Sequence, residues 1–294
     1  MSIFTGAGVA IITPFNEDGS VNYEEFGRII DDQISGGSDA IIVCGTTGES
    51  STMDHDEHIE VIKYCVEKVA GRVPVIAGSG SNCTREAINI SKRAEEVGAN
   101  GLLCVTPYYN KCTQEGLYQY YKAISDAVNI PIIMYNIPGR TGTTIQPETA
   151  VRIAKEVKNV VAIKEASGNI SAVAKLAALA DGCIDIYSGN DDQVLPILSL
   201  GGKGVISVWS HVAPKKVHDM VYAYLNGDTA TATKLQLEAI DVIGALFCEV
   251  NPIPVKAAMN MLGYKAGPVR APLTELSDAH KVLLKKALKD YGVL

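Results

Sequence analysis

A lysine and a tyrosine stand near the ends of two apolar runs, where their side chains could do covalent and acid–base chemistry. Lys164 ends the run VVAIK, and Tyr135 lies in PIIMYN. In an extended strand Ala162 and Lys164 share one face, and the small Ala162 leaves room for the lysine stem. Apolar surroundings lower the pKa of an amine, and a neutral amine forms Schiff bases with carbonyl compounds. Lys164 is therefore either such a nucleophile or a lysine that extends to solvent.

Two loops and the phenol of Tyr135 add groups that could bind anions or transfer protons. GTTGES (45–50) is bracketed by glycines, so its backbone amides can turn toward an anion, or it is a plain loop capped by threonine. Tyr135 can pass protons if it has a partner, or it simply fills the space at the strand end. Arg140, in a Pro-Gly-Arg turn, can bind a carboxylate through two N–H groups or remain solvated.

Eight apolar runs of strand type would carry these groups, with helical patterns between them. Asn22 and Glu25 match a capping box at the start of the first helix, and Gly36-Gly37 end it. Strands followed by helices predict a parallel sheet covered by helices, and a closed (β/α)8 TIM barrel of the α/β class is favoured over an open doubly wound sheet. The runs are 8–15, 40–45, 73–80, 101–110, 131–139, 160–166, 184–190 and 204–210.

The chain divides into a predicted barrel at 1–225 and a predicted helical extension at 226–294 packed on it. In parallel barrels the active site forms where the strands end, which is where Lys164, Tyr135 and the two loops lie.

Composition excludes several classes of protein. The net charge of −7 opposes binding to nucleic acid or to an anionic membrane, and no apolar stretch is long enough to span a bilayer. The N-terminal segment lacks the basic leader of a secretory signal, so a cytoplasmic location is expected. Seven scattered cysteines without a C-x-x-C pattern indicate reduced thiols rather than a disulfide framework or a zinc site.

Five motifs occur in order across nearly the whole chain: GTTGES, TPYYN (106–110), YNIPGRTG (135–142), AIKEASGN (162–169) and GVISV (204–208). This set resembles the dihydrodipicolinate synthase family, within the pyruvate-dependent class I aldolases. The resemblance implies a (β/α)8 barrel with a C-terminal helical domain, assembled as a homotetramer of two tight dimers. It also implies a lyase that condenses pyruvate with L-aspartate 4-semialdehyde in the diaminopimelate route to lysine, without a metal or organic cofactor.

The same resemblance implies roles for particular residues. Lys164 matches the Schiff-base lysine, and Thr46 and Tyr135 match two members of a proton relay whose third member, Tyr109, would act in a neighbouring subunit. The positions that match substrate-binding residues are Thr47 for the pyruvate carboxylate, Arg140 for the carboxylate of the semialdehyde, and Gly189 and Ile206 for backbone contacts in the pocket.

A regulatory lysine site at the tight-dimer interface is also implied. The matching positions are Ser50, Ser51, His55, His58, Asn82, Glu86 and Tyr108. Two other interpretations of His55-x-x-His58 are a metal pair, which lacks a third ligand nearby in sequence, and two exposed histidines in the first turn of a helix.

Three other functions compete with this hypothesis. A sialate or 2-keto-3-deoxy sugar-acid aldolase would use the same lysine and tyrosine, but the double threonine of GTTGES and Arg140 favour a short carboxylated aldehyde. A non-catalytic sensor of pyruvate or an amino acid would not need the catalytic side chains. A metal-dependent aldolase is disfavoured because the strand ends carry no His/Asp/Glu group with ligand spacing.

Overall fold

The strands form a closed parallel barrel in a computed structural model that describes residues 2–294. Each strand pairs with the next along the chain, and β8 pairs back with β1 through the register Gly8↔Ile206. The predicted (β/α)8 barrel is therefore confirmed, and the open sheet is excluded. The strands are β1 (Gly6–Ala10), β2 (Ala40–Val43), β3 (Val75–Gly78), β4 (Gly101–Val105), β5 (Ile132–Asn136), β6 (Val160–Glu165), β7 (Asp185–Ser188) and β8 (Gly204–Ser207).

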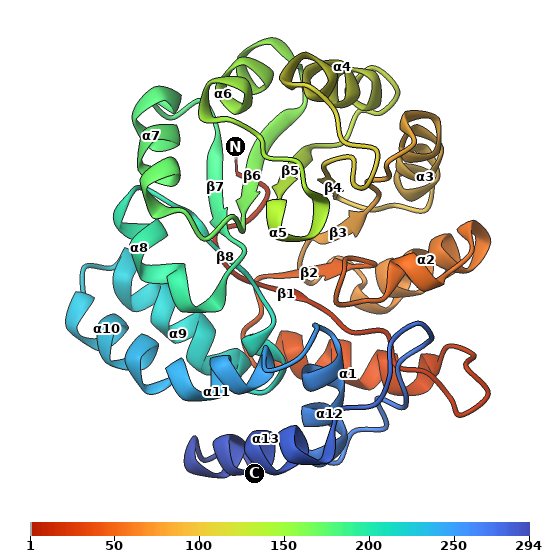
Figure 1. Cartoon of the computed structure of the whole chain (residues 1–294), viewed down its shortest axis with the longest axis vertical. Helices are drawn as coiled ribbons and strands as arrows, with labels where there is room; N and C mark the ends of the chain where they lie inside the picture. Colours follow the sequence, from red (N-terminus) through yellow and green to blue (C-terminus); the bar gives the residue numbers. More distant parts are fainter. Residues whose placement is uncertain (1) are drawn as a thin grey trace.

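Helices surround the barrel, and the last helices of the chain gather along one side of it (Figure 1). The α-helices are α1 (Tyr23–Ser35), α2 (His55–Val69), α3 (Thr84–Glu96), α4 (Gln114–Ser125), α5 (Pro138–Thr141), α6 (Pro147–Glu156), α7 (Ile170–Ala180), α8 (Val194–Ser199), α9 (Pro214–Leu225), α10 (Thr229–Glu238), α11 (Ile240–Leu246), α12 (Ile253–Met261) and α13 (Asp278–Asp290). Short 3-10 helices are η1 (Ser50–Thr52), η2 (Asp191–Gln193) and η3 (Trp209–His211).

The first strand and the first helix differ in detail from the sequence-based prediction. Strand β1 ends at Ala10 rather than near residue 15, because Phe15 leaves the barrel and pairs instead with Val21. At the start of α1 the Asn22 side chain accepts the Glu25 N–H at 3.1 Å, as a capping box requires. The Glu25 carboxylate does not return that bond to Asn22, because one of its oxygens accepts the backbone N–H of Lys265 at 2.8 Å.

Two layers of apolar side chains pack on the two faces of the strands. The barrel interior holds a small cluster that includes Phe4 besides Ala162, Tyr135 and Ile206. A much larger cluster lies between the strands and the helices and includes Ile163, the neighbour of Ala162. This alternation sends Lys164 toward the barrel interior, as its spacing from Ala162 predicts.

The segment after α9 is helical, as predicted, and α10 packs against α9 while α13 packs against α11 and α12. The domain boundary near residue 225 stays a prediction.

Across residues 2–294, none of the helices combines the length and the apolar character that crossing a bilayer demands. The cytoplasmic location stays a prediction.

Candidate active site

Lys164 projects from the end of β6 into the barrel and is only 5% exposed. Ala162 lies one layer below it on the same face, so the lysine stem has space. Burial lowers the Lys164 pKa to about 8, while the negative charge of Asp191 raises it and the positive charge of Arg140 lowers it. A substantial fraction of this amine is therefore neutral near physiological pH, as a nucleophile requires.

Tyr135 lies beside Lys164 because the two residues are register partners on neighbouring strands β5 and β6. The lysine Nζ is 4.4 Å from the centre of the tyrosine ring. Burial raises the Tyr135 pKa to about 12, while the charge of Arg140 and a side-chain hydrogen bond with Thr46 lower it. The phenol thus stays protonated, and its hydrogen-bond partner is Thr46 in the GTTGES loop.

The GTTGES loop forms a tight turn directly after β2. The Gly48 N–H donates to the Gly45 carbonyl at 3.1 Å, and the Glu49 N–H donates to the Thr46 carbonyl at 3.1 Å. Thr46 is half-buried and Thr47 is buried. The turn therefore presents two neighbouring hydroxyl groups at the same end of the barrel as Lys164.

Arg140 reaches this end of the barrel from the short helix α5, which the motif YNIPGRTG forms directly after β5. Its Nη2 donates to the backbone carbonyl of Asn251 at 3.0 Å. The Asn251 side chain in turn donates to Thr47 Oγ1 at 2.9 Å. One residue from the C-terminal segment thus holds both an arginine and a threonine of the site, and Arg140 remains exposed to solvent.

Gly189 and Ile206 also border the lysine. The Gly189 N–H donates to the Glu165 carbonyl at 2.7 Å, next to Lys164 on β6. A Cβ on Gly189 would lie 3.0 Å from the Lys164 Cε and 2.6 Å from the Ala166 Cβ, so the backbone passes the lysine at a distance that excludes a larger residue. Ile206 packs in the same interior cluster as Tyr135 and is 1% exposed.

Asp191, which the sequence analysis did not single out, is the buried acid of the site. Its Oδ2 accepts the N–H groups of Val208 and Trp209 at 3.0 and 2.8 Å, directly after β8. Burial raises the Asp191 pKa, while hydrogen bonds from Ser207, Trp209 and Val208 lower it. The stretch SGNDD (188–192) at the end of β7 contains the signal, but its two adjacent aspartates do not reveal which one turns inward. In the structure Asp192 is exposed.

Tyr109 is not part of this arrangement within one chain. Its side chain is 92% exposed and its φ is 69°, a left-handed conformation that is uncommon for a tyrosine. The neighbouring Tyr108 is 37% exposed. The loop after β4 therefore directs these aromatic rings toward solvent and away from the barrel interior.

The residues predicted to bind lysine fall around the start of α2 and α3, where His55 and Glu86 form the central contact. His55 Nε2 is 2.6 Å from Glu86 Oε1, and the Ser81 hydroxyl donates to the other Glu86 oxygen. The Ser81 hydrogen bond, followed by that of His55, lowers the Glu86 pKa. His58 is buried and its Nε2 bonds to the Gly78 carbonyl at 2.8 Å, so the two histidines have different partners.

The remaining predicted residues lie near this pair in sequence or structure. Ser50 and Ser51 form the first part of η1, which precedes α2. The backbone carbonyl of Asn82 accepts the side-chain N–H of Asn110 at 2.9 Å, which links the α3 side to the loop that carries Tyr108.

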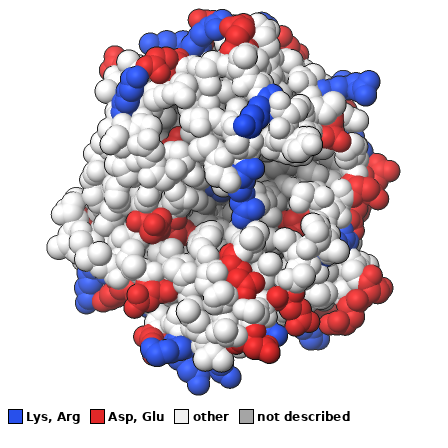
Figure 2. Space-filling view, viewed as in Figure 1, with Lys and Arg blue, Asp and Glu red and all other residues white. Residues whose placement is uncertain are grey.

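The face that carries the strand ends is hollowed near its centre, and both basic and acidic side chains stand around the hollow (Figure 2). The surroundings of the hollow therefore carry charges of both signs on a protein whose net charge is −7. Four segments bring the candidate residues to one end of the barrel: β6 carries Lys164, β5 carries Tyr135, α5 carries Arg140, and the GTTGES loop carries Thr46 and Thr47.

Comparison with known proteins agrees with this geometry. Residues 3–291 match the dihydrodipicolinate synthetase family. The 4-hydroxy-tetrahydrodipicolinate synthase of Lachnoclostridium phytofermentans is 55% identical over 294 residues, which are 100% of both chains. That of Caldicellulosiruptor bescii is 57% identical over 293 residues, covering 100% of this chain and 99% of the relative.

Solved structures are similar over the same length. A chloride-inhibited dihydrodipicolinate synthase from Acinetobacter baumannii, complexed with pyruvate, is 42% identical, with a TM-score of 0.96 and 99% coverage of each chain. The enzyme of Cyanidioschyzon merolae with lysine bound is 40% identical, with a TM-score of 0.97 and 100% coverage of each. A monomeric dihydrodipicolinate synthase variant is 44% identical, with a TM-score of 0.97, covering 99% of this chain and 98% of the variant.

Proposed function

Because this chain belongs to the dihydrodipicolinate synthetase family, we propose that it condenses pyruvate with L-aspartate 4-semialdehyde to give 4-hydroxy-tetrahydrodipicolinate, on the diaminopimelate route to lysine. The observation that carries this proposal is the buried amine of Lys164 beside the protonated phenol of Tyr135. Such a pair supports Schiff-base chemistry on a keto acid, with a proton donor next to the reacting nitrogen.

Lys164 begins the reaction as a neutral amine. Its nitrogen attacks the ketone carbon of pyruvate, and loss of one water gives a protonated imine. The positive nitrogen withdraws electrons, so a proton leaves the methyl group and an enamine forms. The enamine carbon then attacks the aldehyde of the second substrate, whose amine displaces Lys164 and closes the ring. Lys164 is released unchanged at the end of the cycle, and the steps use only groups of the chain and its substrates.

Tyr135 carries the protons that these steps release and require. Its hydrogen bond with Thr46 supports a relay that continues through hydroxyl groups. Tyr109 is the third member, supplied by a neighbouring subunit; its 92% exposure in the single chain supports a role outside its own barrel. The site then depends on assembly into at least a dimer, and the tetramer of two tight dimers is part of this proposal.

Two residues recognise carboxylates in the proposed complex. Thr47, with the amides of its turn, binds the carboxylate of pyruvate, and Arg140 binds that of the semialdehyde. Both residues are held by Asn251, which fixes the spacing between the two carboxylate positions. A sugar-acid aldolase would instead need groups that pair with several hydroxyls, so the exposed Arg140 cation supports the shorter substrate.

The cluster around His55 and Glu86 is proposed to bind lysine as a feedback inhibitor. A carboxylate with a lowered pKa suits the ammonium of an amino acid, and the Cyanidioschyzon merolae relative was solved with lysine bound. Ser50, Ser51, His58, Asn82 and Tyr108 complete the proposed site.

A coupled assay with pyruvate and aspartate semialdehyde tests the function. The expected result is product formation that requires both substrates. In parallel, pyruvate with borohydride is expected to add one adduct per chain, on the peptide that contains residue 164. An adduct on a different lysine, or product formed by a Lys164→Ala chain, would contradict the proposal.

A further inference from the structure

A buried ion pair joins helix α12 to the GTTGES loop. Lys256 Nζ lies 2.7 Å from Glu49 Oε1, and the two side chains are 2% and 1% exposed. Removing two charges from water is costly, and a buried pair is often no more stabilising than two apolar side chains of similar size. Stability of the fold therefore does not by itself account for this pair.

Both partners are fixed by additional contacts. Glu49 Oε2 accepts the backbone N–H of Arg270 at 2.9 Å. Lys256 Nζ donates to the Pro268 carbonyl at 2.8 Å and lies 3.9 Å from the centre of the Phe15 ring. The ion pair is thus held in one geometry from both ends.

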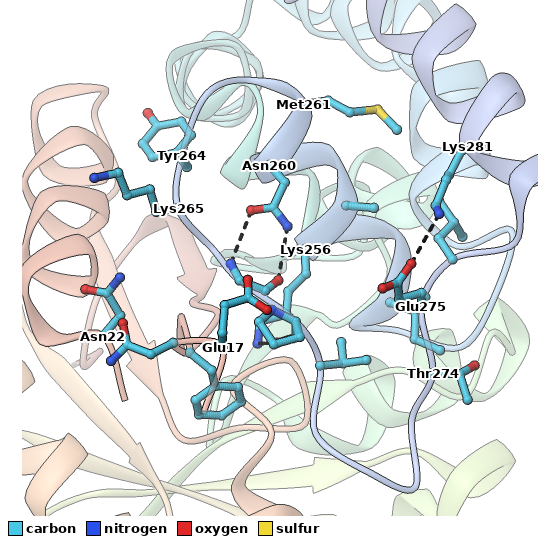
Figure 3. A pocket seen from close by; sticks show the side chains of 18 residues that line it. Glu17, Asn22, Lys256, Asn260, Met261, Tyr264, Lys265, Thr274, Glu275 and Lys281 are labelled. Carbon is cyan, nitrogen blue, oxygen red and sulfur yellow. Dashed lines mark hydrogen bonds and ion pairs between the residues drawn. The ribbon is translucent and has the colours of Figure 1, made fainter. Parts of the chain in front are cut away.

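Lys256 also borders a cavity of about 770 Å³ (Figure 3). The lining of this cavity comes from α12, from residues 15–17 after β1, from the segments 264–269 and 274–276, and from Asn22 and Lys281. The Lys256 side chain is itself buried, so its ammonium group needs polar partners inside the protein. These polar partners are the Pro268 carbonyl and the carboxylate of Glu49, and Glu49 is the one that carries a charge.

Glu49 is connected directly to Thr46. Its N–H closes the turn on the Thr46 carbonyl at 3.1 Å, and its φ is 56°, in the left-handed region. A residue with a side chain is strained in this conformation and keeps it where the surroundings hold it. The Glu49 carboxylate, which is bound by Lys256 and by the Arg270 N–H, stabilises this conformation. The position of Thr46 therefore depends on residues of the C-terminal segment.

We propose that Lys256 is a positioning residue: through Glu49 it sets the turn that directs the Thr46 hydroxyl toward Tyr135. This inference rests on the proposed function, since the Thr46–Tyr135 relay belongs to it. Lys256 touches neither substrate in this proposal. Its effect is on the rate of the proton-transfer steps and not on recognition of the second substrate.

The test compares the wild type with Lys256→Met and with Glu49→Gln/Lys256→Met. The double variant leaves no buried charge, so its melting temperature is expected to stay close to that of the wild type. Its kcat, and its rate of borohydride-trapped imine formation with pyruvate, are expected to fall about ten- to a hundredfold, because small misplacements of catalytic groups have effects of this size. The KM for aspartate semialdehyde is expected to change little, because Arg140 is held separately by Asn251.

Lys281→Met is the matched control, because Lys281 lines the same cavity but pairs with Glu275 at the surface. It is expected to leave kcat and imine formation unchanged. A double variant that melts like the wild type and also forms the imine at the wild-type rate would overturn the inference. If the double variant does not fold, Glu49→Gln alone is expected to slow imine formation. Imine formation at the wild-type rate in Glu49→Gln would also overturn the inference. Failure of the proposed function would look different, as a wild-type chain that forms no product from aspartate semialdehyde.

Discussion

The Lys164 nitrogen lies 4.4 Å from the centre of the Tyr135 ring, and the two residues are register partners on adjacent parallel strands. Their shared burial lowers the Lys164 pKa to about 8 and raises the Tyr135 pKa to about 12. Both shifts favour the uncharged form, because a low-dielectric interior disfavours an ammonium and a phenolate alike. The phenol therefore stays protonated, and the amine loses its proton at a lower pH than an exposed lysine does, which increases the share of the form that attacks a carbonyl carbon.

The first prediction concerns the pH dependence of imine formation. The reactive form of Lys164 is the deprotonated amine, so the rate with pyruvate is expected to rise with pH and level off above about 8. Below that midpoint the rate is expected to fall about tenfold for each pH unit, as the ammonium replaces the amine. Rapid quenching into borohydride at a series of pH values measures this rate. A midpoint near 10.5, the ordinary value for lysine, would contradict the effect of burial.

The carboxylate of Asp191 offers a way to move that midpoint. Its negative charge raises the Lys164 pKa, so Asp191→Asn is expected to shift the midpoint to lower pH. Asp192→Asn is the control, because this neighbouring acid is exposed and is expected to leave the midpoint in place. Equal shifts in the two variants would mean that the net charge of the protein, and not the buried Asp191 carboxylate, sets the Lys164 pKa.

Arg140→Ala is expected to impair the reaction with aspartate semialdehyde but not the binding of pyruvate. Loss of this cation is expected to lower kcat/KM for aspartate semialdehyde at least about tenfold, since a hydrogen-bonded charge is lost. Trapping of pyruvate on Lys164, measured well above pH 8, is expected to persist. Arg152→Ala, which removes a surface arginine paired with Glu115, serves as the control. Equal loss of pyruvate trapping would assign Arg140 a different role.

Tyr109 is expected to act across a subunit interface, because its side chain is 92% exposed in its own chain. Tyr109→Phe and Lys164→Ala chains should each be almost inactive. When the two are mixed and allowed to exchange subunits, some sites combine an intact lysine with an intact partner tyrosine, and activity should return. The coupled assay, with subunit exchange verified by mass spectrometry, measures this recovery. Mixed oligomers without activity would count against a shared site.

Lysine inhibition is expected to depend on Glu86. Its carboxylate has a lowered pKa and is bound by Ser81 and His55, so Glu86→Gln should raise the lysine concentration for half-inhibition at least about tenfold. The uninhibited rate should change little. Glu96→Gln, at the last residue of the same helix, is the control. Unchanged inhibition in Glu86→Gln would place lysine elsewhere.

Much of the fold was predictable because its signals are local. Eight apolar runs, each followed by a helical pattern, predicted the strand order. They also led to the prediction that the candidate site lies where the strands end. The inward direction of Lys164 followed from its spacing to Ala162, since strand residues alternate between faces. The cap at Asn22 was confirmed, but the bounds of β1 and the return bond from Glu25 were not. Phe15 and Glu25 have partners at Val21 and Lys265, which alternation and capping rules do not consider.

The amino-acid sequence by itself determined most of the candidate side chains, although not Asp191, and the strands that present them. Only the tertiary structure decided which other residues hold them. Asn251 and Thr47 are 204 residues apart, yet they share a hydrogen bond, and Lys256 meets Glu49 across a similar stretch of chain. The physical reason is that strand period and helix capping act over a few residues, whereas burial, charge pairing and pKa depend on every segment that the closed barrel brings together.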